Sequence, residues 1–261
     1  MKIDSKTKVI VTGGSKGIGK GIAKAFAARG AKIHTVSRTE PEQLQDEIMD
    51  AGAADHKFWP VDLTTFEGAD AFYKSFSEKE GCPDILINNA GQLTGGLLEE
   101  QPPEKIFQML QVNLSTLILL TRFFLPEMLK RGSGKIVNNA SVSGKMFFPC
   151  ASTYAASKAG VVGFTESLKQ ELRGTGVSTL LLITAGVKTE MYDEIHDLYG
   201  GHLDLDFLSS VPVSDWANEI LNAVESDQDI LWPPGSSRVG VNLAHHMPRF
   251  FEKLISGKFK R

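Results

Sequence analysis

The sequence has few of the residues that mark a metal site, a disulfide framework or a nucleic-acid surface. Its 261 residues include only 2 cysteines, Cys82 and Cys150, and the 6 histidines are scattered apart from His245 and His246. Neither pattern has metal-ligand spacing, so we expect no bound metal. Lys and Arg number 28 against 31 Asp and Glu, and the net charge is −3. Without a basic excess, the chain is not expected to bind nucleic acid.

Long hydrophobic runs are also missing. No stretch of about 18 apolar residues occurs, and the N-terminus MKIDSKTKVIVTGG enters a strand-like run without the apolar segment of a signal peptide. We therefore expect a cytoplasmic protein. No internal repeat, low-complexity tract or linker interrupts the chain, which predicts one domain over residues 1–261.

Short apolar segments alternate with helical patterns along most of the chain. This alternation predicts an α/β fold with βαβ units and a parallel sheet covered by helices on both faces. The predicted strands are residues 8–12, 31–36, 58–61, 84–88, 134–140 and 177–183.

A glycine-rich turn, GGSKGIG, follows the first predicted strand and opens a helix. With Gly13, Gly17 and Gly19 it presents backbone N–H groups and the positive end of the helix dipole to an anion such as a cofactor phosphate. A glycine turn that only packs helix against strand is the alternative. At the end of the second strand stand Ser37 and Arg38 instead of an acidic residue, and with Lys16 they favour the 2′-phosphate of NADP over NAD. Both cations could instead be solvated surface charges.

The segment YAASK holds Tyr154 and Lys158 four residues apart, on one face of a predicted helix. Taken alone, this spacing fits a packed tyrosine beside a lysine whose charged end reaches solvent. The YAASK segment is preceded, in order along the chain, by TGGSKGIG, by NNAG at 88–91 and by Ser141. With these motifs the chain resembles the short-chain dehydrogenase/reductase family, in its compact single-domain branch, over residues 8 to about 190.

The resemblance implies a Rossmann-like, doubly wound parallel sheet of about seven strands, with NADP(H) across its carboxyl edge. It implies that Tyr154 is the general acid/base, that Lys158 supports it and binds the nicotinamide ribose, and that Ser141 holds the substrate oxygen. Asn113 would support a water relay to Lys158. A nearby ammonium stabilises a phenolate, so we expect the pKa of Tyr154 to be lowered.

The implied cofactor contacts lie in the glycine turn, at strand ends and in the segment after the sixth strand. They are Gly13, Ser15, Lys16, Gly17, Ile18, Gly19, Ser37, Arg38, Asp62, Leu63, Asn89, Ala90, Gly91, Tyr154, Lys158, Gly186, Val187 and Thr189. Two positions depart from the family pattern. Ala185 replaces a proline that would stiffen its turn, and Ala140 replaces the first of two serines.

The pattern loosens over residues 187–212, which we interpret as a substrate loop. An apolar ketone or alcohol is favoured by the residues expected beside it, although several of them could simply pack the loop. These residues are Leu93, Leu97, Met146, Phe147, Phe148, Cys150, Met191 and Tyr192.

Residues 236–261 form a C-terminal extension in which Phe250, Phe251, Leu254 and Ile255 have helical spacing among basic residues. Such a helix could dock on a neighbouring subunit, close the pocket or touch an anionic membrane surface. Docking on protein is the plainer interpretation. The resemblance implies a homodimer or homotetramer.

Together these features predict an NADP(H)-dependent oxidoreductase that transfers hydride between nicotinamide and a ketone or secondary alcohol, and specifically a carbonyl reductase for an apolar small molecule. The alternative is a non-catalytic NADP-binding regulator or scaffold of the same fold. The sequence does not identify the substrate.

Overall fold

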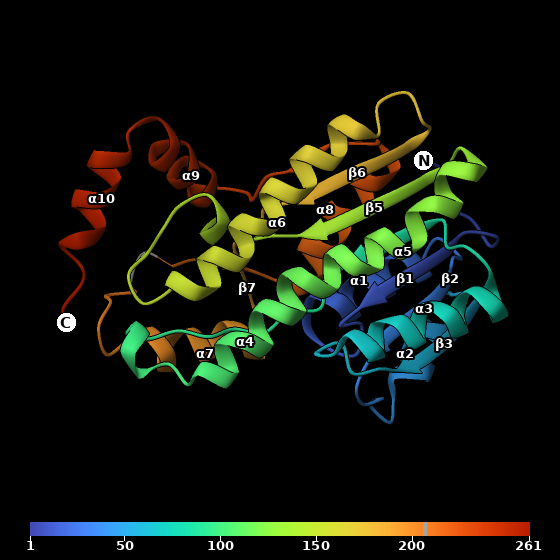
Figure 1. Ribbon diagram of the computed structural model, residues 1–261, viewed down its shortest axis with the longest axis horizontal. Helices are drawn as coiled ribbons and strands as arrows, with labels where there is room; N and C mark the ends of the chain where they lie inside the picture. Colours follow the sequence, from blue (N-terminus) through green and yellow to red (C-terminus); the bar gives the residue numbers. More distant parts are fainter. Residues whose placement is uncertain (206–207) are drawn as a thin grey trace.

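A seven-stranded sheet forms the centre of the molecule (Figure 1). The computed structural model describes residues 1–205 and 208–261; residues 206–207, inside the predicted substrate loop 187–212, lie outside the described residues. The strands are β1 (Lys8–Thr12), β2 (Lys32–Ser37), β3 (Asp55–Pro60), β4 (Ile85–Asn88), β5 (Gly134–Asn139), β6 (Val177–Leu182) and β9 (Ile230–Leu231). All neighbours pair in parallel in the order β3-β2-β1-β4-β5-β6-β9, which confirms the predicted fold.

The predicted strands match the observed ones except at the two edges of the sheet. Prediction found only the second half of β3, because Asp55, His56 and Lys57 are polar residues of an edge strand. It missed β9, whose two residues are too few to show a period.

Helices cover both faces of the sheet (Figure 1). One face packs on α1 (Gly17–Ala27), α2 (Leu44–Asp50) and α8 (Val213–Glu225), and the other packs on α3 (Phe66–Glu80), α5 (Thr116–Arg131) and α6 (Ser152–Glu171). The remaining helical segments are the 3₁₀ turns Leu98–Glu100 and Val142–Gly144, α4 (Pro103–Leu110), the π-turn Gln111–Ser115, α7 (Glu190–Tyr199), α9 (Ser236–His246) and α10 (Pro248–Ser256). A two-stranded sheet joins β7 (Gly186–Val187) and β8 (Ser210–Val211).

The helical stretch Pro103–Arg131 is long and apolar enough, by length and composition alone, to cross a membrane. Its apolar side nevertheless packs inside the molecule. Leu120, Phe124 and Met128 are buried against Phe72 and Phe76 of α3, so the stretch is a core helix of this fold.

The strand order reverses between β1 and β4. From β1 the chain builds the sheet outward through β2 and β3, and from β4 it builds the other way through β5, β6 and β9. The connections therefore leave a crevice beyond the carboxyl ends of β1 and β4, where ligands bind in open α/β sheets.

The C-terminal helices α9 and α10 lie at one end of the molecule, beyond the sheet and beside the segment that precedes α6 (Figure 1). Phe251 and Ile255 of α10 are buried in a cluster with Tyr199 and Leu203. The extension is thereby anchored to the segment that follows α7.

Candidate active site

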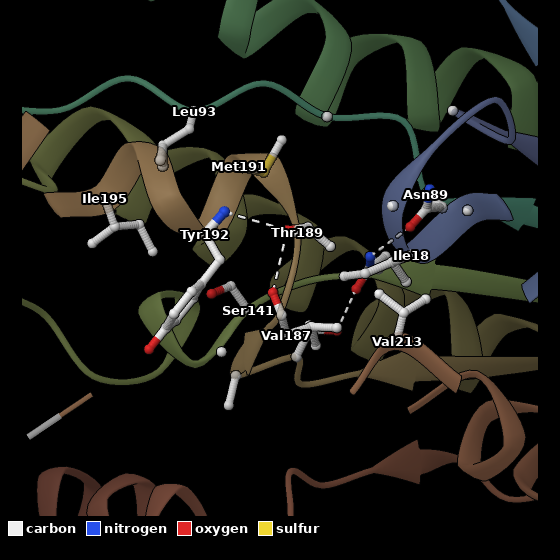
Figure 2. A pocket seen from close by; sticks show the side chains of 18 of the residues that line it. Ile18, Asn89, Leu93, Ser141, Val187, Thr189, Met191, Tyr192, Ile195 and Val213 are labelled. Carbon is white, nitrogen blue, oxygen red and sulfur yellow. Dashed lines mark hydrogen bonds between the residues drawn. The ribbon is translucent and has the colours of Figure 1, made fainter. Parts of the chain in front are cut away.

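A cavity of about 1510 Å³ opens at the carboxyl ends of the strands. Figure 2 shows side chains from both of its ends: Ile18 and Asn89 lie on one side, and Leu93, Met191 and Ile195 on the other. All eighteen residues predicted to contact the cofactor line this cavity. We call the part between the glycine turn and Tyr154 the cofactor end, and the apolar part beyond Tyr154 the substrate end.

The glycine turn fits a phosphate group. Helix α1 begins at Gly17 and has no side-chain cap, so its first N–H groups are left for another acceptor. The turn is tightly folded, since a Cβ on Gly19 would overlap the carbonyl oxygen of Gly13 and lie 2.7 Å from Asn89 Nδ2. These residues can therefore hold the pyrophosphate of a dinucleotide.

Thr12 fastens the neighbouring strand end to this turn. Its hydroxyl oxygen accepts hydrogen bonds from the backbone N–H groups of Asn89 (2.9 Å) and Ala90 (3.0 Å), and Asn89 Nδ2 donates to its carbonyl oxygen. Through these hydrogen bonds the NNAG motif holds the ends of β1 and β4 at a fixed separation.

The cations predicted to bind the 2′-phosphate occupy different surroundings. Arg38 is exposed; hydrogen bonds from Thr64 lower the pKa of Asp62, and the charge of Arg38 adds a smaller effect in the same direction. Lys16 forms an ion pair with Glu190 at the start of α7. Sequence reasoning missed Glu190, which lies 174 residues from its partner.

Tyr154, Ser141 and Lys158 all line the cavity, and Tyr154 forms a side-chain hydrogen bond with Ser141. Ser141 precedes the 3₁₀ turn after β5, and its hydroxyl oxygen accepts a hydrogen bond from Ser143 N. Lys158 is buried, and its Nζ donates to the carbonyl oxygen of Asn139 over 2.8 Å and lies 5.7 Å from the centre of the Tyr154 ring. Helix α6 and the end of β5 therefore bring the three predicted residues together.

The expectation that Lys158 lowers the pKa of Tyr154 is wrong for the chain by itself. Burial raises the pKa of Tyr154 to about 12, and only a hydrogen bond with Ser141 opposes the rise. Burial also lowers the pKa of Lys158 to about 8. Because removal from water disfavours both charged forms, the apolar wall outweighs the attraction between the two groups.

Asn113 is buried in the π-turn and does not line the cavity. Its side chain bridges two segments: Oδ1 accepts from Gln92 N, and Nδ2 donates to Gln92 O and to the Ser157 hydroxyl. These hydrogen bonds join Asn113 to Gln92 and Ser157, and the water relay to Lys158 stays a prediction.

A buried polar chain beneath the site was not predicted. Asn139 Nδ2 donates to Asn89 Oδ1 (2.9 Å), Thr184 Oγ1 donates to Asn139 Oδ1 (2.6 Å), and Trp216 Nε1 donates to Thr184 Oγ1 (3.2 Å). It links the ends of β4, β5 and β6 to α8. Since the Asn139 carbonyl also accepts from Lys158, the chain fixes the acceptor that holds this lysine.

The segment after β6 folds back over the glycine turn. Thr189 caps α7, accepting from Tyr192 N and donating to Val187 O (Figure 2). A Cβ on Gly17 would lie 3.3 Å from its methyl group. Gly186, Val187 and Thr189 thus line the cavity beside the glycine turn, and their contact with the nicotinamide stays a prediction.

The substrate end is apolar. Five of the predicted residues line it, and the cavity wall also includes residues from the second half of the chain. The first group is Leu93, Met146, Phe148, Met191 and Tyr192; the second is Ile195, Tyr199, Leu203, Leu205, Leu208, Leu243, Phe251, Leu254 and Ile255. Gly95 admits the ring of Tyr199, which a Cβ there would overlap.

Three predicted lining residues do not reach the cavity. Phe147 is 63% exposed and points away between two lining neighbours, and Leu97 is half-buried outside the wall. The Cys150 side chain is buried, and its backbone adopts a left-handed conformation with φ 66°.

Comparison with known proteins agrees with this geometry. The family model described as short chain dehydrogenase matches residues 7–199. The chain belongs to the short-chain dehydrogenase family. It is 34% identical over 199 residues to the 3-oxoacyl-[acyl-carrier-protein] reductase FabG of Vibrio cholerae serotype O1, covering 76% of this chain and 80% of that protein.

Two solved structures of short-chain dehydrogenases are similar over nearly the whole chain. A Sphingobium yanoikuyae enzyme in complex with NADPH has a TM-score of 0.77 and 25% identity, covering 97% of this chain and 93% of the other. A metagenomic oxidoreductase in complex with NADP has a TM-score of 0.73 and 26% identity, covering 90% and 100%. This short-chain dehydrogenase therefore has a fold built around a nicotinamide cofactor, while α8, α9 and α10 lie outside the matched family segment.

Proposed function

We propose that this short-chain dehydrogenase reduces an apolar ketone with NADPH, and that Tyr154 is its proton donor. One observation carries the proposal: Tyr154, Ser141 and Lys158 line one cavity together with an uncapped helix N-terminus and many apolar side chains. A bound nicotinamide would supply hydride to the carbonyl carbon, and the oxygen would then need a proton.

The chain's own residues provide that proton and orient the oxygen. The raised pKa of Tyr154 keeps its phenol protonated at neutral pH, which suits a donor. Ser141 lies beside it and can donate a hydrogen bond to the same oxygen. The Lys158 ammonium stabilises the phenolate that remains after transfer, and the apolar wall excludes water that would compete.

Charge supports NADP(H) over NAD(H). The end of β2 carries Ser37 and exposed Arg38 without an acidic residue, and Lys16 of the glycine turn lines the same cavity. The two similar structures with NADP and NADPH point the same way.

Turnover of NADPH with a panel of ketones tests the chemistry. Tyr154→Phe keeps the ring and removes the proton donor, so kcat should fall about 100-fold to 10,000-fold. Ser143→Ala, beside the site, is the matched control. Equal rates for Tyr154→Phe and the unsubstituted enzyme would overturn the role of Tyr154, and absence of turnover with every ketone would favour a non-catalytic NADP-binding protein.

Titration of cofactor fluorescence tests the preference. Arg38→Asp places a carboxylate beside the 2′-phosphate and should weaken NADPH binding about 10-fold or more, leaving NADH binding unchanged or tighter. Tighter binding of NADH than NADPH by the unsubstituted protein would refute the proposed preference for NADP(H).

A further inference from the structure

Helix α10 presents three distinct rows of side chains. Phe251 and Ile255 form an inner row, buried at 8% and 5% exposure. Phe250 and Leu254 form an outer row with Met247 next to them, and these three are 54%, 51% and 53% exposed. Residues three, four and seven apart share a helix face, so the outer row is a continuous apolar strip in solvent.

A basic row borders this strip. Arg249 and Lys253 are one position before Phe250 and Leu254, about 100° around the helix, on the side away from the inner row. Both are exposed, and neither forms an ion pair within the described ranges 1–205 and 208–261. The helix thus carries apolar and cationic rows side by side.

Charge is concentrated around the same helix. The whole chain has a net charge of −3, but residues 236–261 hold six basic side chains and one acidic side chain, Glu252. Two of the six, Lys258 and Arg261, form ion pairs with Asp204 and Glu99, so the excess of positive charge rests mainly on the others, Arg249 and Lys253 of α10 among them. The exposed His245 and His246 lie directly before α10. A local positive field of this kind attracts anionic surfaces and repels a second copy of itself.

The inner row connects this surface to the substrate end. Phe251 and Ile255 line the cavity, and Leu254 lies both in the cavity wall and in the outer row. The extension is therefore a thin apolar partition between the pocket and the molecular surface.

We propose that the outer row of α10 contacts an anionic membrane surface. Phe250, Leu254 and Met247 enter the boundary between headgroups and acyl chains, and the cations of Arg249 and Lys253 meet lipid phosphates. A pairing of two α10 helices is disfavoured because it would bring the two basic rows together with only Glu252 to balance them. This inference does not depend on the proposed reaction.

Co-sedimentation with vesicles tests the contact, without cofactor or substrate. The full chain should bind vesicles of phosphatidylcholine and phosphatidylserine, bind pure phosphatidylcholine much more weakly, and be released by salt. Arg249→Gln with Lys253→Gln should lower the partition coefficient about 30-fold. Phe250→Ser should lower it about 10-fold.

Matched controls separate this surface from general effects. Phe66→Ser removes a phenylalanine of similar exposure (52%) at the start of α3, and Lys2→Gln with Lys6→Gln removes the same charge elsewhere; both should bind as the unsubstituted chain does. Phe250 does not line the cavity, so Phe250→Ser should keep its rate of NADPH oxidation in vesicle-free buffer.

Three outcomes would overturn the proposal. The first is equal binding to neutral and anionic vesicles, and the second is unchanged binding by Phe250→Ser and the double glutamine variant. The third is absence of vesicle binding together with a change of oligomeric state on Phe250→Ser, by sedimentation velocity, which would make the strip an interface between copies of this chain.

Discussion

The two ends of the cavity are built in different ways. The cofactor end consists of backbone, glycine and short polar side chains at the ends of parallel strands, with Thr12 and Asn89 as its braces. The substrate end consists of large apolar side chains from helices and connecting segments, with Phe251 as an example. The first end depends on close backbone approach and the second on side-chain volume, so substitutions at the two ends should have different consequences.

The largest expected effect is at the cofactor end. In Gly19→Ala the new Cβ would overlap the Gly13 carbonyl oxygen, so the turn must move away from its phosphate-binding shape. We expect NADPH to bind about 1,000-fold more weakly, measured by fluorescence titration. Gly163→Ala on α6 is the control, because its Cβ would meet nothing within 4 Å. Normal NADPH binding by Gly19→Ala would show that the turn is more adaptable than its packing indicates.

Acid should weaken the sheet behind the cofactor end. Burial lowers the pKa of His34 on β2 from 6.5 to about 4, and it also lowers the pKa of His56 on β3. The unfolded chain therefore binds more protons than the folded one between pH 6.5 and about 4. Stability is complete above pH 6.5 and falls as the pH drops, by up to about 3 kcal/mol for His34.

Urea unfolding at neutral pH and near pH 4.5 measures this loss. Carboxyl groups whose pKa the fold lowers, such as Glu47 and Asp62, lose most of their contributions below this interval, so the histidines dominate the change within it. His34→Gln should reduce the dependence on pH, while His245→Gln, in the exposed extension, should leave it unchanged. A free energy of unfolding that is constant across the interval would refute the prediction.

The substrate end should respond to volume. Phe251 packs edge-on against Phe148 with ring centres 5.8 Å apart. Phe251→Ala enlarges the pocket and should lower kcat/KM about 10-fold for bulky apolar ketones, with NADPH affinity unchanged. Steady-state rates with small and bulky ketones measure the difference. Equal losses for both ketones, or weaker NADPH binding, would mean that the two ends are not separate.

The same contrast explains what could be predicted from the sequence. The cofactor end could be predicted from local sequence signals. These are a glycine turn after a strand, the NNAG motif at the end of β4 and the four-residue spacing of Tyr154 and Lys158. The substrate end depends on where α7, α9 and α10 pack, and no periodic pattern in the sequence reveals that packing. Phe147 illustrates the difficulty, since its neighbours Met146 and Phe148 line the cavity and it faces solvent.

Two further features were out of reach for a different reason. The pKa of Tyr154 reflects burial by residues distant in sequence, and the position of Lys158 alone does not reveal it. The hydrogen bond between Asn139 and Thr184 joins residues 45 apart and requires the register of β5 against β6. Helix α7 did carry a local signal, since Thr189 followed by Glu190 is a common helix start.

The smallest effect tests whether the buried polar chain serves the cofactor end. Trp216 belongs to α8, outside the matched family segment, yet its Nε1 donates to Thr184 beside Ala185, the position at which the family resemblance leads us to expect proline. We infer that this bond restrains the turn that a proline would otherwise stiffen. Trp216→Phe keeps a buried ring and removes the donor, so it should cost about 1 kcal/mol of unfolding free energy.

That loss should be accompanied by NADPH binding about threefold weaker, because Gly186 and Val187 continue the same turn into the cavity. Thr184→Ser keeps the hydroxyl and is the control, and both variants are compared by urea unfolding and NADPH titration. If Trp216→Phe lost stability but bound NADPH unchanged, the chain would only hold α8 to the sheet. A coupled loss would show that a residue of α8, outside the matched family segment, supports the cofactor end.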